Sequence, residues 1–247
     1  MTVGNFGGAN FAGLLKLSFC IVLVLFAVDL RLCQPAWGQG ETKESLKKQM
    51  QDLLPKLEEH LEAHPDSSEG HYCRGMSRYL SNDHAGAESD FARAESLGLK
   101  DKLFDFYSIR GLNFLLMKRY VEAEKQLNLA LKMNPSDTLC LTNRACVYCE
   151  TGRYREALVD AQRAISLAAR GSIPHCVAGT CYLKCGQYKY ALQYLDKAVQ
   201  INFKNSEALY MRAVTCEKLG LKERAAKDFA AARALGYKPG ESYNEEL

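Results

Sequence analysis

The chain has 247 residues, of which 47% are hydrophobic and 25% are charged, and its 6 prolines and 18 glycines are too few for long disordered linkers. It contains 32 lysines and arginines against 29 acidic residues, and no stretch gathers the positive charge. This balance excludes the basic footprint of a nucleic-acid-binding protein.

The N-terminal region contains an apolar run, residues 17–28, between Lys16 and Asp29. A run of this length is short for a membrane span and is typical of the core of a signal peptide. Ala36 and Gly38 are small residues at the spacing that a signal peptidase reads. We therefore interpret residues 1–38 as a signal peptide, with an uncleaved membrane anchor and an untargeted cytosolic chain as the alternatives.

A leading amphipathic helix is expected within residues 39–67. Its apolar residues follow helical spacing, and Pro55 is expected to kink or break it. These apolar residues are Leu46, Met50, Leu53, Leu57 and Leu61.

Small residues then recur with a period of 34 residues. One equivalent position holds Ala87, Ala123, Ala157, Ala191 and Ala225. A second holds Ala94, Ala130, Ala164, Ala198 and Ala232, and a third holds Gly75, Gly111, Ala145, Gly179 and Ala213. Each unit is predicted to be a helix, a tight turn and a second helix. The units begin near Ser68, Phe104, Thr138, Ser172 and Ser206, and only the first is followed by two extra residues.

The pattern resembles the tetratricopeptide repeat (TPR) family, whose repeats carry a large, a small and an aromatic residue on the first helix and two alanines on the second. The third repeat shows this pattern as Leu141, Ala145, Tyr148, Gly152, Tyr154, Ala157, Ala161 and Ala164. The resemblance implies an all-α, right-handed α-solenoid of about five helix-turn-helix repeats over residues 68–239. Residues 240–247 form a C-terminal tail.

No motif indicates an enzyme. The chain lacks a glycine-rich phosphate loop, a G-x-S-x-G sequence and an H-E-x-x-H sequence. His71 and His175 fall where the first helix carries a large packing residue, so we interpret both as packing residues. We expect no catalytic residue, no cofactor and no metal.

Cysteines are frequent after the leader, where eight occur. The first helices need small residues, and cysteine is a small apolar one, so we expect buried free thiols. Disulfides, or a metal site on the Cys140–Cys185 cluster, are the less favoured alternatives. The eight are Cys73, Cys140, Cys146, Cys149, Cys176, Cys181, Cys185 and Cys216.

The family resemblance implies a peptide or partner helix bound in a concave groove made by the first helices. The residues expected to line this peptide-binding groove are mostly apolar or soft, and they either pack inward or form a trough for a hydrophobic segment. They are Tyr72, Met76, Tyr79, Ile109, Leu112, Leu115, Asn143, Cys146, Cys149, Val177, Thr180, Leu183, Met211 and Val214.

Asn143 matches the asparagine of a carboxylate clamp found in some members of the family. The clamp's basic residues are missing, because Ser108, Leu112, Ile173 and Val177 occupy flanking positions. A single amide does not neutralise two carboxylates, so a clamp is not expected.

The last four residues, Asn244–Leu247, resemble the retrieval signal of soluble endoplasmic-reticulum proteins. With the leader, they favour the endoplasmic reticulum lumen, and a membrane-anchored or cytosolic location is the alternative. We predict a non-catalytic adaptor or co-chaperone of the secretory pathway that holds an apolar peptide segment, with Asn143 as a hydrogen-bonding anchor. Its partner would be a protein or peptide, such as a chaperone or an unfolded client.

The alternative function is a scaffold for one dedicated partner in complex assembly, either cytosolic or tethered to the membrane. Contact with a membrane is expected only if residues 17–28 stay uncleaved, and no nucleic acid is expected. A thiol-redox or metal protein is a third possibility.

Overall fold

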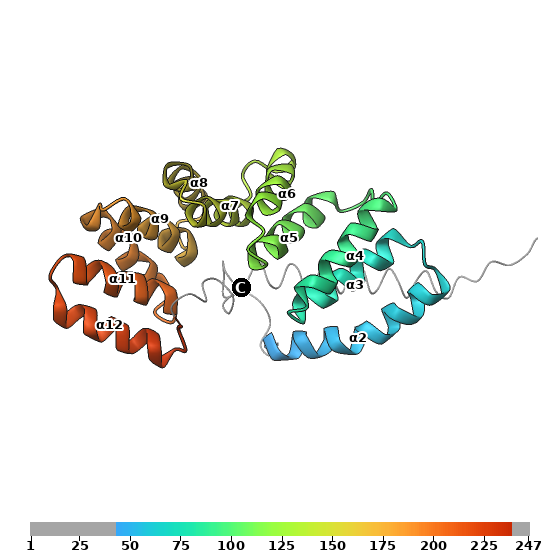
Figure 1. Ribbon diagram of the computed structural model, residues 1–247, viewed down its shortest axis with the longest axis horizontal. Coiled ribbons are helices and arrows are strands. Elements are labelled where there is room, and N and C mark those ends of the chain that lie inside the picture. Colours follow the sequence, from blue (N-terminus) through green and yellow to red (C-terminus); the bar gives the residue numbers. More distant parts are fainter. Residues whose placement is uncertain (1–42, 239–247) are drawn as a thin grey trace, which may run out of the picture. The chain divides into compact units, whose positions relative to one another are not determined.

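The computed structural model describes residues 43–238, which form helices and no strands (Figure 1). The chain divides into two compact units between Leu99 and Lys100. The first unit contains α2 (Lys43–Ala63), α3 (Ser68–Leu80) and α4 (His84–Ser96). The predicted leader at residues 1–38 and the tail at residues 240–247 lie outside the described residues.

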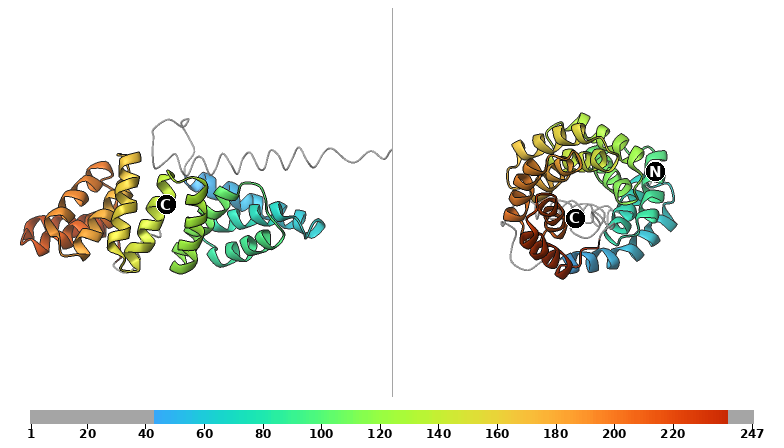
Figure 2. Two further views of the ribbon diagram at one scale, coloured as in Figure 1. Left: turned by 90° about the horizontal axis from the view of Figure 1, so that it is seen from above. Right: turned by 60° about the vertical axis from the view of Figure 1, so that its left-hand side comes forward.

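The second unit contains four helix pairs that follow one another in chain order (Figure 2). Each first helix packs on its own second helix, and each second helix contacts the first helix of the next pair. The pairs are α5 (Leu103–Leu116) with α6 (Tyr120–Met133), α7 (Thr138–Glu150) with α8 (Tyr154–Leu167), α9 (Ser172–Lys184) with α10 (Tyr188–Ile201), and α11 (Ser206–Lys218) with α12 (Lys222–Ala234). This arrangement confirms the predicted α-solenoid of helix pairs. Repeats of this length bury apolar surface mainly by stacking on one another.

The predicted repeat starts agree with the helix starts at four positions and differ by one residue at the second, where α5 begins at Leu103. Side-chain caps explain several of these starts. The carboxylate of Asp137 accepts a hydrogen bond from the Cys140 backbone N–H at 2.7 Å, and the Asn205 side chain accepts one from Ala208 at 2.8 Å. These bonds satisfy N–H groups that a helix leaves free in its first turn.

The turn between the two helices of a repeat requires a left-handed backbone. Gly152, Gly186 and Gly220 have φ angles of 78°, 73° and 77° there. Asn82 and Lys118 occupy the same position in the first two repeats, with φ angles of 64° and 58°. Glycine adopts this conformation without a Cβ clash, whereas a lysine is strained in it.

The small repeat positions are buried where the two helices of a pair cross. All ten alanines of the two second-helix positions are at most 2% exposed. At the glycine position of the first helix, a Cβ on Gly179 would lie 2.6 Å from Leu195 Cγ, and one on Gly75 would lie 2.7 Å from Phe91. The small residues therefore make room for a large residue on the facing helix.

Two further features depend on local sequence. Pro55 lies inside the single helix α2 rather than at a break between two helices. The division between the units falls in the connection between α4 and α5, where Lys102 of the second unit has a φ angle of 56°.

Buried ion pairs join the helices of three repeats. Arg144 Nε donates to Asp160 at 2.7 Å and Arg212 Nε donates to Asp228 at 2.7 Å, each pair being 16 residues apart. In the first repeat, Arg74 donates to Asp90 with the same separation. The guanidinium group in each case neutralises a carboxylate that is buried between the helices.

Among the residues that the structure describes, no helix is long and apolar enough to cross a membrane. The apolar run at residues 17–28 lies outside the described residues.

Candidate protein-binding surface

In the second unit, the first helices contact one another along the array. α5 contacts α7, α7 contacts α9 and α9 contacts α11. We call the residues that these four helices present next to one another the first-helix surface. Tyr72, Met76 and Tyr79 belong to α3 of the first unit, where Tyr72 and Met76 are buried and Tyr79 is half-buried.

The structure places most of the predicted groove residues of the second unit inside the array. Ile109, Met211 and Val214 are half-buried, and the other residues of this set are buried. The buried ones are Leu112, Leu115, Asn143, Cys146, Cys149, Val177, Thr180 and Leu183. Buried side chains pack against their neighbours, so only part of this set is available for contact with a partner.

In the last two repeats, some of the predicted groove residues pack into a buried cluster. Leu183 belongs to a buried cluster formed by α9, α10, α11 and α12. Met211 and Val214 pack against the edge of this cluster. They therefore stabilise the stack and keep part of their surface exposed.

Asn143 differs from its apolar neighbours. Its side chain lies on α7 and is only 2% exposed, and its Nδ2 amino group has no hydrogen-bond partner. A buried donor without a partner costs about 1–3 kcal/mol, and buried polar groups in folded proteins are rarely left in this state. The hydroxyl of the buried Thr180 on α9 is also without a partner, so the first-helix surface has two polar groups that an external partner would satisfy.

The other clamp-related positions are used for packing. Ser108 accepts a hydrogen bond from the Cys140 thiol at 3.2 Å, and both residues are buried. Val177 is fully buried.

The eight cysteines are free, and seven of them are buried while Cys185 is exposed. The neighbouring Cys181 thiol and burial together raise the pKa of the Cys149 thiol. Burial also raises the pKa of the Cys176 thiol. These thiols are protonated at neutral pH and pack as small apolar groups. Across the described part of the chain, no three His, Cys, Asp or Glu side chains lie together as a metal site.

His71 and His175 are both buried at the large first-helix position. His175 Nδ1 lies 2.7 Å from the carbonyl oxygen of Gly171, and His71 Nε2 lies 3.0 Å from that of Pro65. His71 Nδ1 also lies 3.3 Å from the carboxylate of the buried Asp90, so this histidine takes part in the polar contact between α3 and α4.

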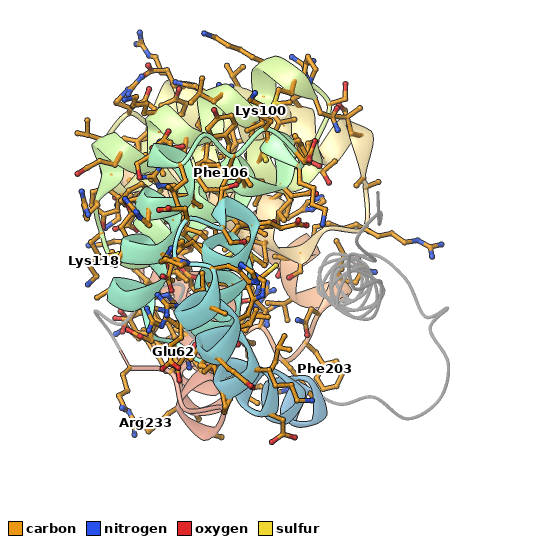
Figure 3. The ribbon with its side chains drawn as sticks, turned by 90° about the vertical axis from the view of Figure 1, so that its right-hand side faces the viewer. Glu62, Lys100, Phe106, Lys118, Phe203 and Arg233 are labelled. Atoms are coloured by element: carbon orange, nitrogen blue, oxygen red, sulfur yellow. The ribbon has the colours of Figure 1, made fainter. Side chains whose placement is uncertain are left out.

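The arginine–aspartate pairs were not predicted from the sequence. Their signal is the repetition of Arg74 and Asp90 at the equivalent positions of the third and fifth repeats. Exposed apolar residues outside the first helices were also missed, and the most exposed include Val121 on α6, Val159 on α8 and Phe203 after α10. Figure 3 labels Phe203.

Comparison with known proteins agrees with this architecture. Residues 175–205 match the family model of the tetratricopeptide repeat. Anaphase-promoting complex subunit 3 of Schizosaccharomyces pombe is 25% identical over 178 residues, which cover 72% of this chain and 26% of that protein. Hsp70-Hsp90 organizing protein 3 of Arabidopsis thaliana is 29% identical over 100 residues, which cover 40% of this chain and 18% of that protein. The chain thus corresponds to a minor part of each relative.

Among solved structures, that of the APC/C hetero-tetramer Cut9-Hcn1 superposes with a TM-score of 0.66 at 14% identity, covering 80% of this chain and 39% of that one. This likeness concerns the fold. The helix pairs, the family-model match over residues 175–205 and the relatives together support the resemblance of this chain to the tetratricopeptide repeat family.

Proposed function

We propose that this protein is a non-catalytic adaptor or co-chaperone that holds an apolar polypeptide segment on its first-helix surface. The observation that carries the proposal is the unpartnered amino group of Asn143 on α7. A backbone carbonyl oxygen of a bound segment accepts this hydrogen bond and offsets the cost of the buried donor. Because Asn143 is buried, binding includes a local movement of the side chains that cover it.

The residues around Asn143 suit an apolar ligand. Cys146 follows it by one turn on the same helix, and the half-buried Ile109 lies on the preceding first helix, α5. The Cys149 and Cys176 thiols have raised pKa values and stay neutral, so they offer apolar contacts beside the amide donor of Asn143. Apolar side chains of the segment would supply most of the binding free energy, and Asn143 would fix its backbone.

The relatives support a role beside other proteins. One of them is named an Hsp70-Hsp90 organizing protein, and another is a subunit of the anaphase-promoting complex. Repeat arrays of this family are generally scaffolds rather than enzymes, which supports the non-catalytic assignment.

The secretory location belongs to the proposal and is supported by the sequence of residues 17–28 and of Asn244–Leu247. The expected result is that the intact chain stays in the endoplasmic reticulum, whereas a chain that lacks Asn244–Leu247 is secreted. Cytosolic localisation of both chains would contradict this part of the proposal.

The holding role is tested by the aggregation of reduced insulin, a model unfolded client, in the presence of equimolar protein. The proposed function predicts that aggregation is suppressed and that Asn143→Leu weakens the suppression. The leucine keeps the volume of the side chain and removes an unsatisfied polar group, so the melting temperature should stay equal or rise.

The control is Val159→Ser, which removes an exposed apolar side chain from α8, outside the first-helix surface. Its suppression of aggregation should equal that of the unchanged protein. If the unchanged protein fails to suppress aggregation, or if Asn143→Leu acts only by lowering the melting temperature, the holding role is wrong.

The burial of most groove residues favours a second candidate, a scaffold for one dedicated partner. A surface with few exposed apolar residues suits one complementary ligand better than many. Saturable binding of a single protein with slow dissociation would distinguish this scaffold from a co-chaperone that binds many clients weakly.

A further inference from the structure

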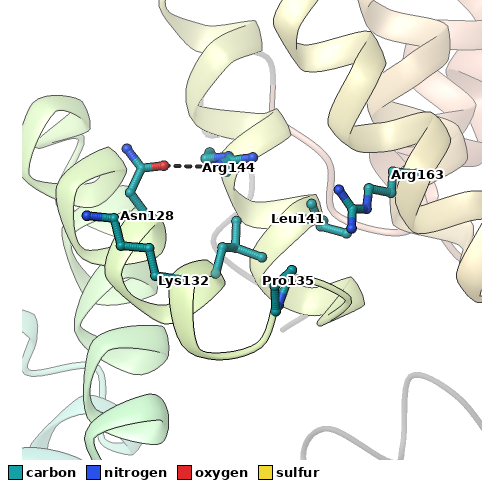
Figure 4. A pocket seen from close by; sticks show the side chains of 7 residues that line it. Asn128, Lys132, Pro135, Leu141, Arg144 and Arg163 are labelled. Carbon is teal, nitrogen blue, oxygen red and sulfur yellow. Dashed lines mark hydrogen bonds between the residues drawn. The ribbon is translucent and has the colours of Figure 1, made fainter.

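A cavity of about 360 Å³ lies between α6, α7 and α8 of the second unit, and none of the predicted groove residues lines it (Figure 4). Its apolar lining includes Leu141 and Pro135, and its polar lining comes from all three helices. Asn128 and Lys132 lie on α6, Arg144 on α7 and Arg163 on α8. We call this the α6–α8 pocket.

The pocket has three cationic side chains and no carboxylate among its lining residues. The charge of Arg144 is compensated, because its Nε and Nη2 donate to Asp160 at 2.7 and 2.9 Å. Its remaining Nη1 donates to the neutral side-chain oxygen of Asn128 at 2.7 Å. Lys132 and Arg163 are exposed and have no ion pair within the described part of the chain. Two positive charges of the pocket are therefore uncompensated.

The same place between the fourth and fifth repeats provides an internal comparison. Arg212 is the counterpart of Arg144, 68 residues later, and it donates to Asp228 in the same way. Its Nη1 donates to Asp196, a carboxylate at the position of Asn128. Asp196 also pairs with Arg224. Between the fourth and fifth repeats, the carboxylate of Asp196 therefore supplies the negative charge.

Within the second unit, the combination of two free cations with the arginine on the first helix is specific to the α6–α8 pocket. The counterparts of Lys132 and Arg163 between the fourth and fifth repeats are Gln200 and Ala231. Between the third and fourth repeats, Ala178 stands at the position that corresponds to Arg144. The repeat framework therefore does not require this combination of residues.

We propose that the α6–α8 pocket binds an oxyanion, a carboxylate or a phosphate, carried by a polypeptide segment. The oxyanion supplies the negative charge that Asp196 provides between the fourth and fifth repeats, and it pairs with Lys132 and Arg163. The planar guanidinium group of Arg163 suits either anion, and the apolar lining at Leu141 and Pro135 accepts an adjacent side chain. This site shares helix α7 with the first-helix surface but uses none of the predicted groove residues.

The test uses three short fluorescent peptides that share one sequence and differ at a central residue, which is glutamate, phosphoserine or glutamine. Fluorescence anisotropy at low ionic strength measures their affinities for the full chain. At least one of the two anionic peptides should bind ten times more tightly than the glutamine peptide, and salt should weaken this binding. The tighter of the two identifies the carboxylate or the phosphate as the ligand.

Asn128→Asp is the decisive variant, because it supplies the carboxylate found at Asp196 and fills the site from within. It should reduce the affinity for the anionic peptide at least tenfold. Lys132→Gln and Arg163→Ala, which introduce the residues of the fourth and fifth repeats, should each weaken binding in the same direction. Thermal unfolding confirms that each variant is folded.

Lys125→Ala is the matched control, since it removes one exposed positive charge from α6 outside the pocket. It should leave the affinity within a factor of two. Equal binding of all three peptides, no binding of any, or unchanged binding to Asn128→Asp would overturn the proposal.

Discussion

At the scale of single residues, the turn inside each repeat is the clearest link between sequence and backbone. Three of the five turns place glycine in the left-handed region, and the second repeat places Lys118 there with a φ angle of 58°. The sequence pattern identifies the turn even where the glycine is missing, since the residues on both sides keep their spacing. Whether the backbone of the turn is strained then depends on the type of residue at the left-handed position.

Lys118→Gly is expected to stabilise the protein by about 0.5–1 kcal/mol, because it removes the strain of a left-handed non-glycine residue. Thermal unfolding should show a rise in the melting temperature of roughly 2–4 °C. Gly152→Ala is the matched reverse change: its new Cβ would have no atom within 4 Å, so only the backbone conformation is tested. A lower melting temperature for Lys118→Gly would contradict this account of the turn.

At the scale of helix pairs, the sizes of two facing residues compensate each other. Gly75, Gly111 and Gly179 face Phe91, Leu127 and Leu195, each 16 residues later. The third repeat has Ala145 on the first helix and Ala161 on the second, both fully buried. The larger residue on one helix is thus matched by the smaller one on the other, which keeps the crossing filled without overlap.

Ala161→Leu should destabilise the protein by about 1–3 kcal/mol, because the leucine overlaps the Cβ of Ala145. Adding Ala145→Gly recreates the Gly179–Leu195 pair and should recover part of this loss. The free energies of unfolding of the two single variants and the double variant measure the coupling, which is expected at about 0.5–3 kcal/mol. Additive effects would show that the two positions do not compensate.

At the scale of the whole molecule, the sequence predicts the features that recur in every repeat. It does not predict the features that depend on packing between neighbouring repeats. The 34-residue period located the helix pairs and the buried alanines, because one constraint acts at every repeat. The burial of Cys146 and Val177 could not be read from spacing, since it depends on how neighbouring first helices come together.

The α6–α8 pocket was missed for a similar reason. Lys132 and Arg163 lie in different repeats, and only the packed helices bring them together. Asn143, by contrast, was selected by its family resemblance, and the structure adds that its amino group has no partner. Its contact with a ligand remains a prediction.

The most direct test of the central claim is hydrogen exchange of the full chain with and without a neutral apolar peptide in excess. A neutral peptide avoids the α6–α8 pocket, so it reports on the first-helix surface alone. The account predicts slower exchange in α7 and in its neighbours α5 and α9, with α6, α8 and α10 unchanged. Protection confined to the second helices, or no protection at saturating peptide, would contradict the claim that the first helices hold an apolar segment.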